Sequence, residues 1–366
     1  MKKGATRVKK LCFCLLLAAL IFTASDFAYA DYKKEYKLDI VPSITSGWGK
    51  GAQYFVDLVK ERSKGRINIK VYANSQLTTG KQTNAFMLIR NGAIDFACQS
   101  TINYSPQVVE ANLFALPFFI SGQPDRYKAL DAITGGKSGE MVAKAIEAKG
   151  VKFLCYGENG FRELTNGKRA IKKPEDLKDL KIRVVGSPLF IDSFTAIGCN
   201  SVTMAWSDTI GALQQGVVDG QENPINIFYP INIHDYNKYV TNWHYVADPT
   251  MFVVNPKIWS SFSPEDQELV LQAAKDAAAY QIALARVGID ENDGGKNLRY
   301  LKSIGKEPEI LDWNAELKRV GMEVTDLTPG EISAFVEKTK KTVEQWRAKI
   351  GNDIVTAAEE DMAKVR

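Results

Sequence analysis

The stretch KIRVVGSPLFIDSFTAIGCNSVTMAWSDTIGALQQGVVDGQENP, residues 181–224, decides how the fold of this chain is interpreted. Short runs rich in β-branched residues alternate in it with longer runs of helical pattern. Strands are predicted at 181–185 and 201–205, and helices at 188–197 and 208–217. This alternation of strand and helix predicts an α/β domain.

Upstream of this stretch the chain shows the same alternation. Strands are predicted near residues 37–41, 66–73, 94–99 and 151–156, with helices near 49–63 and 81–91. We expect parallel strands that are covered by helices. The part of the 366-residue chain beyond residue 30 exceeds the size at which a single core usually stops growing, so two domains are predicted.

Downstream, residues 243–255 are predicted to form an extended return segment. Ser263 then has the form of a helix N-cap, because a proline follows it at the first helical position and two acids occupy the first turn. A long helix should run to about residue 287, either as a brace between the domains or as a surface helix. The charged tail from Glu331 is expected to be an amphipathic helical cover.

These elements suggest a division of the chain into two α/β domains. Domain I takes residues 31–157 with about 247–287, and domain II takes about 158–246 with 288–366, including the C-terminal helical cover. A chain that crosses between two domains more than once leaves a cleft between them, and such clefts are favoured ligand sites.

The first thirty residues have the pattern of a cleavable secretory signal peptide. Five basic residues precede an apolar run from Leu11 to Phe22, and Ala28-Tyr29-Ala30 offers small residues at a cleavage site. The apolar run is shorter than the roughly 20 residues that span a bilayer. We expect a mature protein that begins at Asp31 and lies outside the cytoplasm, in the periplasm.

The charge balance gives no indication that nucleic acid is a partner. The whole chain has 47 basic and 43 acidic residues, and residues 1–30 hold five of the basic residues and one acid, which leaves 42 of each sign. Nucleic acid binding by a basic surface therefore has no support from the composition.

Cysteine and histidine usage indicates neither a disulfide framework nor a metal site. Beyond residue 30 the cysteines are Cys98, Cys155 and Cys199, which are scattered singly along the chain. Two of them could form one disulfide bond, but the pattern favours buried cysteines that act as small hydrophobic residues. The two histidines, His234 and His244, show no ligand spacing for zinc. No metal and no cofactor is expected.

Three residues near predicted strand or helix ends are candidates for a ligand site. Arg183 and Gln99 fall at the carboxyl ends of predicted strands, beyond which ligands of open α/β sheets lie, and Trp48 precedes the first helix. A planar guanidinium can donate two parallel hydrogen bonds to an acid group, although Arg183 could instead pair with Asp179 or Glu175 on the surface. The uncharged Gln99 offers no counter-ion for an ammonium group, which weighs against an amino-acid ligand.

The segments KIRV (181–184), GALQQGVVDGQENP (211–224) and GFRELTN (160–166) carry a family resemblance. The chain resembles the solute-binding proteins of tripartite ATP-independent periplasmic (TRAP) transporters, the DctP family. Further matching segments are GRI (65–67), QL (76–77), NGAID (91–95), LPFF (116–119) and WSSFSP (259–264). One departure is Val185, where the family pattern commonly has proline; it concerns the start of a loop.

The resemblance implies roles for four residues. Arg183 would grip the acid group of the ligand, and Arg162 would supply a second positive charge or act as scaffold. Two guanidinium groups at one pocket repel unless an anion lies between them, so the pair favours an anionic ligand. Asn223 would act as a polar partner, or shape the turn before Pro224, and Trp206 would form an apolar wall.

The resemblance also implies a two-domain periplasmic-binding-protein-like fold and a receptor instead of an enzyme. We expect a monomer that closes on a small organic anion and delivers it to a membrane permease of one small and one large subunit, driven by an ion gradient. The ligand would be a carboxylate, such as a dicarboxylate or sugar acid, or a small sulfonate such as isethionate. The alternatives are a receptor of an ATP-driven transporter, a sensor domain, and a secreted hydrolase.

Overall fold

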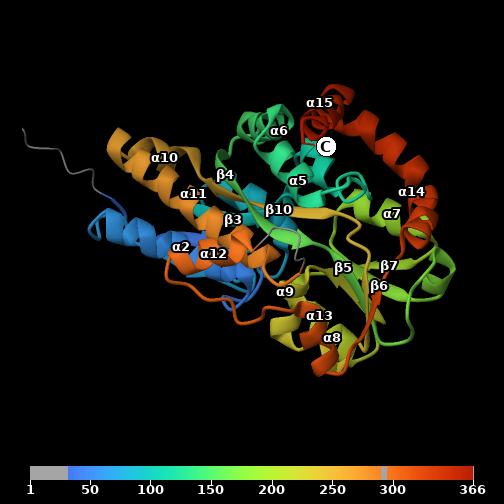
Figure 1. The fold of residues 1–366 in the computed structure, drawn as a ribbon. Helices are drawn as coiled ribbons and strands as arrows, with labels where there is room; N and C mark the ends of the chain where they lie inside the picture. The colour runs from blue at the N-terminus through green and yellow to red at the C-terminus, as the bar shows by residue number, and fades with distance from the viewer. Residues whose placement is uncertain (1–31, 290–294, 366) are drawn as a thin grey trace, which may run out of the picture.

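The computed structural model describes residues 32–289 and 295–365, which form two β-sheets surrounded by helices (Figure 1). The signal peptide predicted at 1–30 and the start predicted at Asp31 lie outside the described residues. Within the described ranges, no helix is long and apolar enough to cross a membrane.

The first sheet has five strands in the order β2-β1-β3-β10-β4. Its strands are β1 (Tyr36–Asp39), β2 (Ile69–Tyr72), β3 (Phe96–Ser100), β4 (Lys152–Phe161) and β10 (Ala247–Val254). Strand β1 is parallel to both of its neighbours, but β10 is antiparallel to β3 and to β4. The four strands expected to be parallel, β1 to β4, therefore run in one direction, and only β10, formed by the predicted return segment, runs against them.

The second sheet has six strands in the order β11-β9-β5-β8-β6-β7. These are β5 (Glu163–Asn166), β6 (Lys181–Val184), β7 (Asn200–Thr203), β8 (Gly220–Asn223), β9 (Tyr239–Asn242) and β11 (Glu323–Asp326). Strand β6 runs parallel to β7 and β8, whereas β5 is antiparallel to β8 and β9. The predicted strand and helix around residue 190 are present, with α7 at Pro188–Ile197.

Helices cover both sheets, and the longest begins where its capping pattern predicts. Helix α11 (Pro264–Arg286) starts after Ser263, whose hydroxyl accepts a hydrogen bond from the backbone N–H of Asp266 at 3.2 Å. It packs against β4 and against α2 (Gly47–Arg62). Beyond its end, the indole Nε1 of Trp313 donates to the carbonyl of Val287 at 3.1 Å, which ties α11 to α13 (Trp313–Arg319) beside the second sheet.

The chain passes from one sheet to the other at two points where one strand follows another, and we call these points the strand crossings. Arg162 alone separates β4 from β5, and residues 243–246 lead from β9 into β10. The backbone N–H of Arg162 donates to the carbonyl of Val246 at 3.1 Å, so the two crossings pair with each other. Positions next to these crossings are therefore held between the two domains.

The C-terminal helices span both domains (Figure 1). Helix α14 (Pro329–Ile350) packs on α7 of the second sheet, and α15 (Asn352–Ala363) packs on α5 (Arg126–Thr134) and α6 (Lys137–Ala148) beside the first sheet. The last helix thus lies against the first domain although its chain follows the second.

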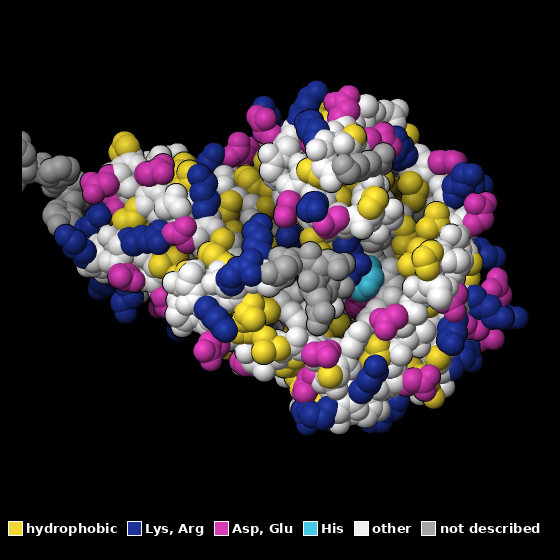
Figure 2. Space-filling model, viewed as in Figure 1, with side chains coloured by type: hydrophobic (Ala, Val, Ile, Leu, Met, Phe, Trp, Pro, Cys, Tyr) yellow, Lys and Arg dark blue, Asp and Glu magenta, His cyan; other side chains and the backbone are white. Residues whose placement is uncertain are grey.

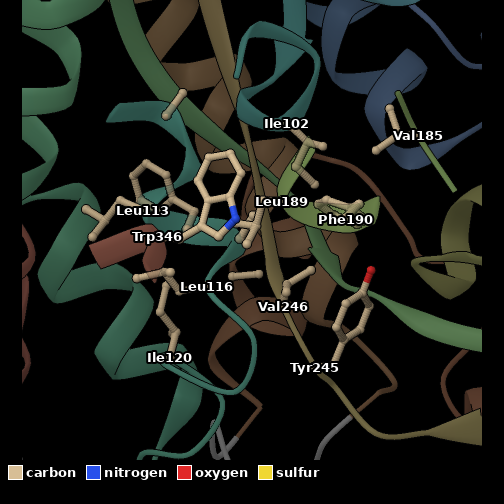
Figure 3. Packing of buried hydrophobic residues seen from close by; sticks show 14 of the residues in the cluster. Ile102, Leu113, Leu116, Ile120, Val185, Leu189, Phe190, Tyr245, Val246 and Trp346 are labelled. Carbon is tan, nitrogen blue, oxygen red and sulfur yellow. The ribbon is translucent and has the colours of Figure 1, made fainter. Parts of the chain in front are cut away.

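The hydrophobic core is continuous across the crossings. Figure 3 shows Leu113, Phe190, Tyr245 and Trp346, which come from the first domain, α7, the second crossing and α14, in one buried cluster. The cysteines Cys98, Cys155 and Cys199 are all free thiols, which agrees with their predicted roles as small apolar residues. On the face drawn in Figure 2, charged side chains of both signs are interspersed.

Candidate ligand-binding site

A cavity lies where the two domains face each other, and both contribute to its walls. It has about 330 Å³ of space between atoms, part of which is open to solvent. The lining residues are Val41, Pro42, Trp48, Gln82, Ser100, Ile102, Asn103 and Asp248 of the first domain, Arg162 of the crossing, and Arg183, Val185, Trp206, Asn223 and Ile227 of the second. The domains therefore stand closed around a small space.

Among the residues that the structure describes, Arg183 is a buried cation without an acidic partner. Its side chain, on β6, is 1% exposed, and its Nε and Nη2 both donate to the backbone carbonyl of Met204, at 3.2 and 2.9 Å. Within the described residues its Nη1 makes no hydrogen bond and no carboxylate pairs with it. The guanidinium carbon lies 5.4 Å from the ring centre of Trp206. This leaves hydrogen-bond donors for an incoming acid.

Burial lowers the pKa of Arg183 to about 10, with a smaller lowering by the nearby guanidinium of Arg162 and an opposing rise due to Glu222. Arg183 therefore still carries its charge at neutral pH. A buried charge without a partner is costly, and an anion in the cavity would reduce that cost.

Arg162 is expected to be a second positive group of the site or a scaffold residue, and the structure pairs it with two acids. Its Nε donates to Glu222 Oε2 at 2.5 Å and its Nη1 to Asp248 Oδ2 at 2.6 Å. Burial lowers the pKa of Arg162, but these two carboxylates raise it further, to well above its ordinary value. Because acids already flank Arg162, the argument that two guanidinium groups repel unless an anion separates them does not apply, and the case for an anion rests on Arg183.

The two acids beside Arg162 were missed by sequence reasoning. Glu222 accepts a further bond from the hydroxyl of Tyr245 at 2.7 Å, and Asp248 accepts from Asn159 Nδ2 at 2.8 Å and from the hydroxyl of Ser100. Glu222 stands inside the quoted stretch, directly before Asn223, so its position could have been noted. Nothing local marks Asp248, which lies 86 residues from Arg162 in the sequence.

Asn223, Trp206 and Trp48 all line the cavity. Asn223 Nδ2 donates to Gln221 Oε1 at 2.8 Å, while its Oδ1 has no hydrogen bond within the described residues. Trp48 Nε1 donates to the carbonyl of Cys98 at 2.9 Å, which fixes the indole as a wall. The structure thus brings these three residues together with Arg162 and Arg183.

Gln99 is the one sequence-predicted site residue that the structure does not place in the cavity lining. It is fully buried, and its amide bonds Asp39 and Asn103 at 2.7 and 3.1 Å. Successive side chains of a strand point to opposite faces, and here the next residue, Ser100, lines the cavity. Strand-end position alone could not show which of the two neighbours faces the cleft.

Comparison with known proteins places the chain in a family. Residues 40–291 match the family model described as bacterial extracellular solute-binding protein, family 7, DctP. The chain belongs to this family. A 2,3-diketo-L-gulonate-binding periplasmic protein of Escherichia coli K12 is 30% identical over 323 residues, covering 88% of this chain and 94% of that protein. The C4-dicarboxylate-binding periplasmic protein DctP of Rhodobacter capsulatus is 29% identical, covering 77% and 80%.

Solved structures show the same fold with ligands bound. A TRAP periplasmic solute-binding protein of Ralstonia eutropha with bound (S)-2-acetolactate has a TM-score of 0.83 and 48% identity, covering 91% of this chain and all of that one. A protein of Advenella mimigardefordensis in complex with galactonate has a TM-score of 0.77 and 26% identity, covering 91% and 98%. The expected TRAP family and two-domain α/β binding-protein fold are thereby confirmed.

The family is a class of extracytoplasmic solute receptors and not a class of enzymes. In the described ranges, no group of three His, Cys, Asp or Glu side chains is placed to hold a metal ion. Neither histidine is among the cavity-lining residues; His244 Nδ1 instead bonds the carboxylate of Glu163.

Proposed function

We propose that this protein is the extracytoplasmic receptor of a TRAP transporter and binds a small organic monocarboxylate in the cavity between its domains. The observation that carries the proposal is Arg183, a buried guanidinium with unused donors and no acidic partner in the described chain. A carboxylate would receive charge-assisted hydrogen bonds from it in a nearly dry setting, where such bonds are strong.

The charges around the cavity favour one acid group over two. Arg162 and Arg183 are balanced by Glu222 and Asp248, and both acids already contact Arg162. A monoanion would therefore use the one guanidinium that has no acid partner among the lining residues. A second acid group would meet no further unpaired cation there and would approach Asp248.

The walls favour a short ligand with apolar substituents. Aliphatic and indole groups supply much of the lining, from Val41, Ile102, Val185, Trp48 and Trp206.

A few polar groups remain for a hydroxyl or keto oxygen. Asn223 Oδ1 has no hydrogen bond within the described residues, and a ligand hydroxyl beside the acid group could donate to it. The 48% identical relative holds (S)-2-acetolactate, and a 27% identical protein of Bordetella holds density interpreted as pantoate. Both are branched hydroxy monocarboxylates, so we propose this class, with (S)-2-acetolactate as the first ligand to test.

Family membership supports the rest of the proposed role. Two of the matched relatives, from Escherichia coli and Rhodobacter capsulatus, are named as periplasmic binding proteins. We propose that a cleaved signal at residues 1–30 exports the chain to the periplasm, where it acts as a monomer. Closed and loaded, it would deliver the acid to a permease of one small and one large membrane subunit, driven by an ion gradient.

The test is binding by residues 31–366, unfolded and refolded to remove any bound acid. The panel contains (S)-2-acetolactate, pantoate, succinate, galactonate and isethionate, and the thermal midpoint is followed. A ligand at about 100 times its dissociation constant adds roughly 2.7 kcal/mol to the native state. We expect shifts with the first two acids. Shifts confined to succinate, galactonate or isethionate would contradict the ligand class, and no shift with any acid would contradict the function.

Arg183→Ala tests the anchor directly. We expect it to abolish the shift while leaving the fold intact, because it removes an unpaired buried charge. Arg319→Ala is the matched control, since the Arg319 side chain is 68% exposed and away from the cavity lining. Equal ligand shifts in the wild type and Arg183→Ala would remove Arg183 from this role.

A further inference from the structure

Four buried side chains form a hydrogen-bond chain from the core of the first domain to the second domain. Gln99 Nε2 donates to Asp39 Oδ2 at 2.7 Å, and Asn103 Nδ2 donates to Gln99 Oε1 at 3.1 Å. Gln82 Nε2 donates to Asn103 Oδ1 at 2.9 Å. Finally, Gln82 Oε1 accepts from the backbone N–H of Trp206 at 2.9 Å. None of the four side chains belongs to a residue more than 8% exposed.

We call this chain of hydrogen bonds, from Asp39 to the Trp206 N–H, the relay. In the closed structure, its two ends set the direction of every bond in it. A backbone N–H can only donate, so Gln82 must present its oxygen to Trp206. At the other end, a carboxylate oxygen of Asp39 accepts, so Gln99 must present its NH2 group. Each amide between the ends then has one orientation only, because reversing one would place donor against donor or acceptor against acceptor.

The relay crosses the cleft beside the proposed anchor. Asp39, Gln99, Asn103 and Gln82 belong to the first domain, whereas Trp206 begins α8 (Trp206–Gln214) of the second. The indole of Trp206 lies 5.4 Å from the guanidinium carbon of Arg183. Closing the domains therefore makes the Gln82–Trp206 bond at the same place where the acid would be held.

Asp39 has few other interactions that could explain its burial. It is fully buried, Gln99 is its only hydrogen-bond donor within the described residues, and its Oδ1 has no partner there. Burying an acid with so few partners costs folding free energy, which suggests that Asp39 has a functional role. Above its raised pKa, Asp39 is a carboxylate that can only accept, so it sets the direction of the neighbouring amides, whereas an amide at this position could accept or donate.

We propose that Asp39 is a positioning residue which, through Gln99 and Asn103, orients Gln82 to latch Trp206 in the closed receptor. This inference rests on the proposed function, because closure around an acid is what the latch would favour. An asparagine at position 39 could present either its oxygen or its NH2 group. In the open receptor, where the Trp206 N–H no longer fixes Gln82, the relay could then take either direction, and about half of the molecules would present the NH2 group of Gln82 instead of its oxygen.

The first test is a double-mutant cycle in (S)-2-acetolactate affinity with Asp39→Asn, Gln82→Leu and the double variant. Losing one hydrogen bond and leaving a buried N–H unpaired corresponds to roughly a tenfold loss of affinity. At pH 8, where Asp39 is above its raised pKa and ionised, we expect about that loss from Gln82→Leu, about a twofold loss from Asp39→Asn alone, and no further loss when Asp39→Asn is added to Gln82→Leu. Equal losses in both backgrounds would overturn the relay.

The matched control is Asp57→Asn on the surface of α2, where Gln53 Nε2 donates to Asp57 at 2.8 Å. It makes the same chemical change to an Asp–Gln pair that is exposed to solvent and takes no part in the relay. We expect it to leave affinity unchanged. A loss equal to that of Asp39→Asn would mean that the effect is not specific to the relay.

Amide hydrogen exchange provides a readout that needs no ligand. In unloaded protein at pH 8, Asp39→Asn should speed exchange at the Trp206 N–H by about twofold, since fewer molecules present the Gln82 oxygen as its acceptor. The N–H of Asp208, which bonds Ala205, is the internal reference and should not change relative to wild type. Unchanged exchange at Trp206 would overturn the relay even where binding is seen.

The two readouts separate the two proposals. Faster exchange at Trp206 without binding of any acid would support the relay and contradict the proposed ligand class. If the Asp39→Asn variant does not fold, Asn103→Leu can be used instead, because it removes the middle side chain of the relay and leaves the Asp39–Gln99 hydrogen bond in place. The same exchange measurement then decides the outcome.

Discussion

At the scale of the residue, Asp39 and Arg183 show two buried charges of opposite sign held in different ways. Arg183 keeps its charge and has unused donors facing a cavity. Asp39 has one amide partner, and burial raises its pKa to about 7. Neither has an ion-pair partner within the described chain, so each should respond strongly to substitution.

Asp39 makes the stability of the unloaded protein depend on pH. Its pKa is raised on folding from an ordinary value of 3.8, so the folded state disfavours the carboxylate. Its unfavourable contribution grows as pH rises from about 4 to about 7 and is constant above that. Asp39→Asn should therefore raise the free energy of unfolding by roughly 2–4 kcal/mol at pH 8 and by almost nothing at pH 4.

Denaturant unfolding at pH 4, 6 and 8 measures this difference, with Asp57→Asn as the control. A stability difference that is the same at all three pH values would show that Asp39 is ionised equally easily in both states. Together with the relay, the expected result would mean that Asp39 lowers stability while favouring closure, a trade-off seen at functional sites.

At the scale of the element, the position of α11 against the first sheet depends on a glycine. A Cβ added at Gly157 on β4 would overlap Gln281 Oε1 of α11 and Thr250 Oγ1 of β10. Strand and helix can approach this closely only because the side chain is absent. The long helix and the strand that leads to the Arg162 crossing are thus fixed to each other.

Gly157→Ala should lower the free energy of unfolding by roughly 1–3 kcal/mol, the usual cost of overpacking a core. Gly211→Ala is a matched control, because Gly211 lies inside α8 with nothing within 4 Å of an added Cβ. The control should be neutral or stabilising by up to about 1 kcal/mol. Urea unfolding compares the two, and equal changes would contradict the close approach.

At the scale of the whole molecule, Arg162 joins the two domains. It lies in the crossing between β4 and β5, and its partners are Glu222 of the second sheet and Asp248 of the first. The sequence allowed Arg162 to be a ligand group or a scaffold. The ion pairs favour a structural tie, although its side chain also lines the cavity.

Arg162→Met separates these roles. Removing the cation would leave two buried carboxylates without it, which should cost roughly 3–5 kcal/mol of unfolding free energy. Arg319→Met, at an exposed pair with Glu316, should show no measurable change. Thermal unfolding without ligand is the measurement. A variant that keeps wild-type stability and loses only binding would make Arg162 a ligand group.

Much of the fold and part of the site followed from local patterns. Strand and helix periodicity around residue 190, the cap at Ser263 and the position of Arg183 at a strand end are all encoded within a few neighbouring residues. Motif resemblance then added the family, which the comparisons confirm. These features are predictable because backbone geometry and capping depend on near neighbours.

The tertiary structure decided the direction of β10, the acids beside Arg162 and the face to which Gln99 points. Each depends on groups far apart in the sequence, as when Asp248 meets Arg162 or Gln82 meets Trp206 across 124 residues. The sequence by itself determined the class of protein and the cation that would hold an acid. Which charges are already paired, and which remain for a ligand, depends on burial and long-range contacts that exist only in the folded chain.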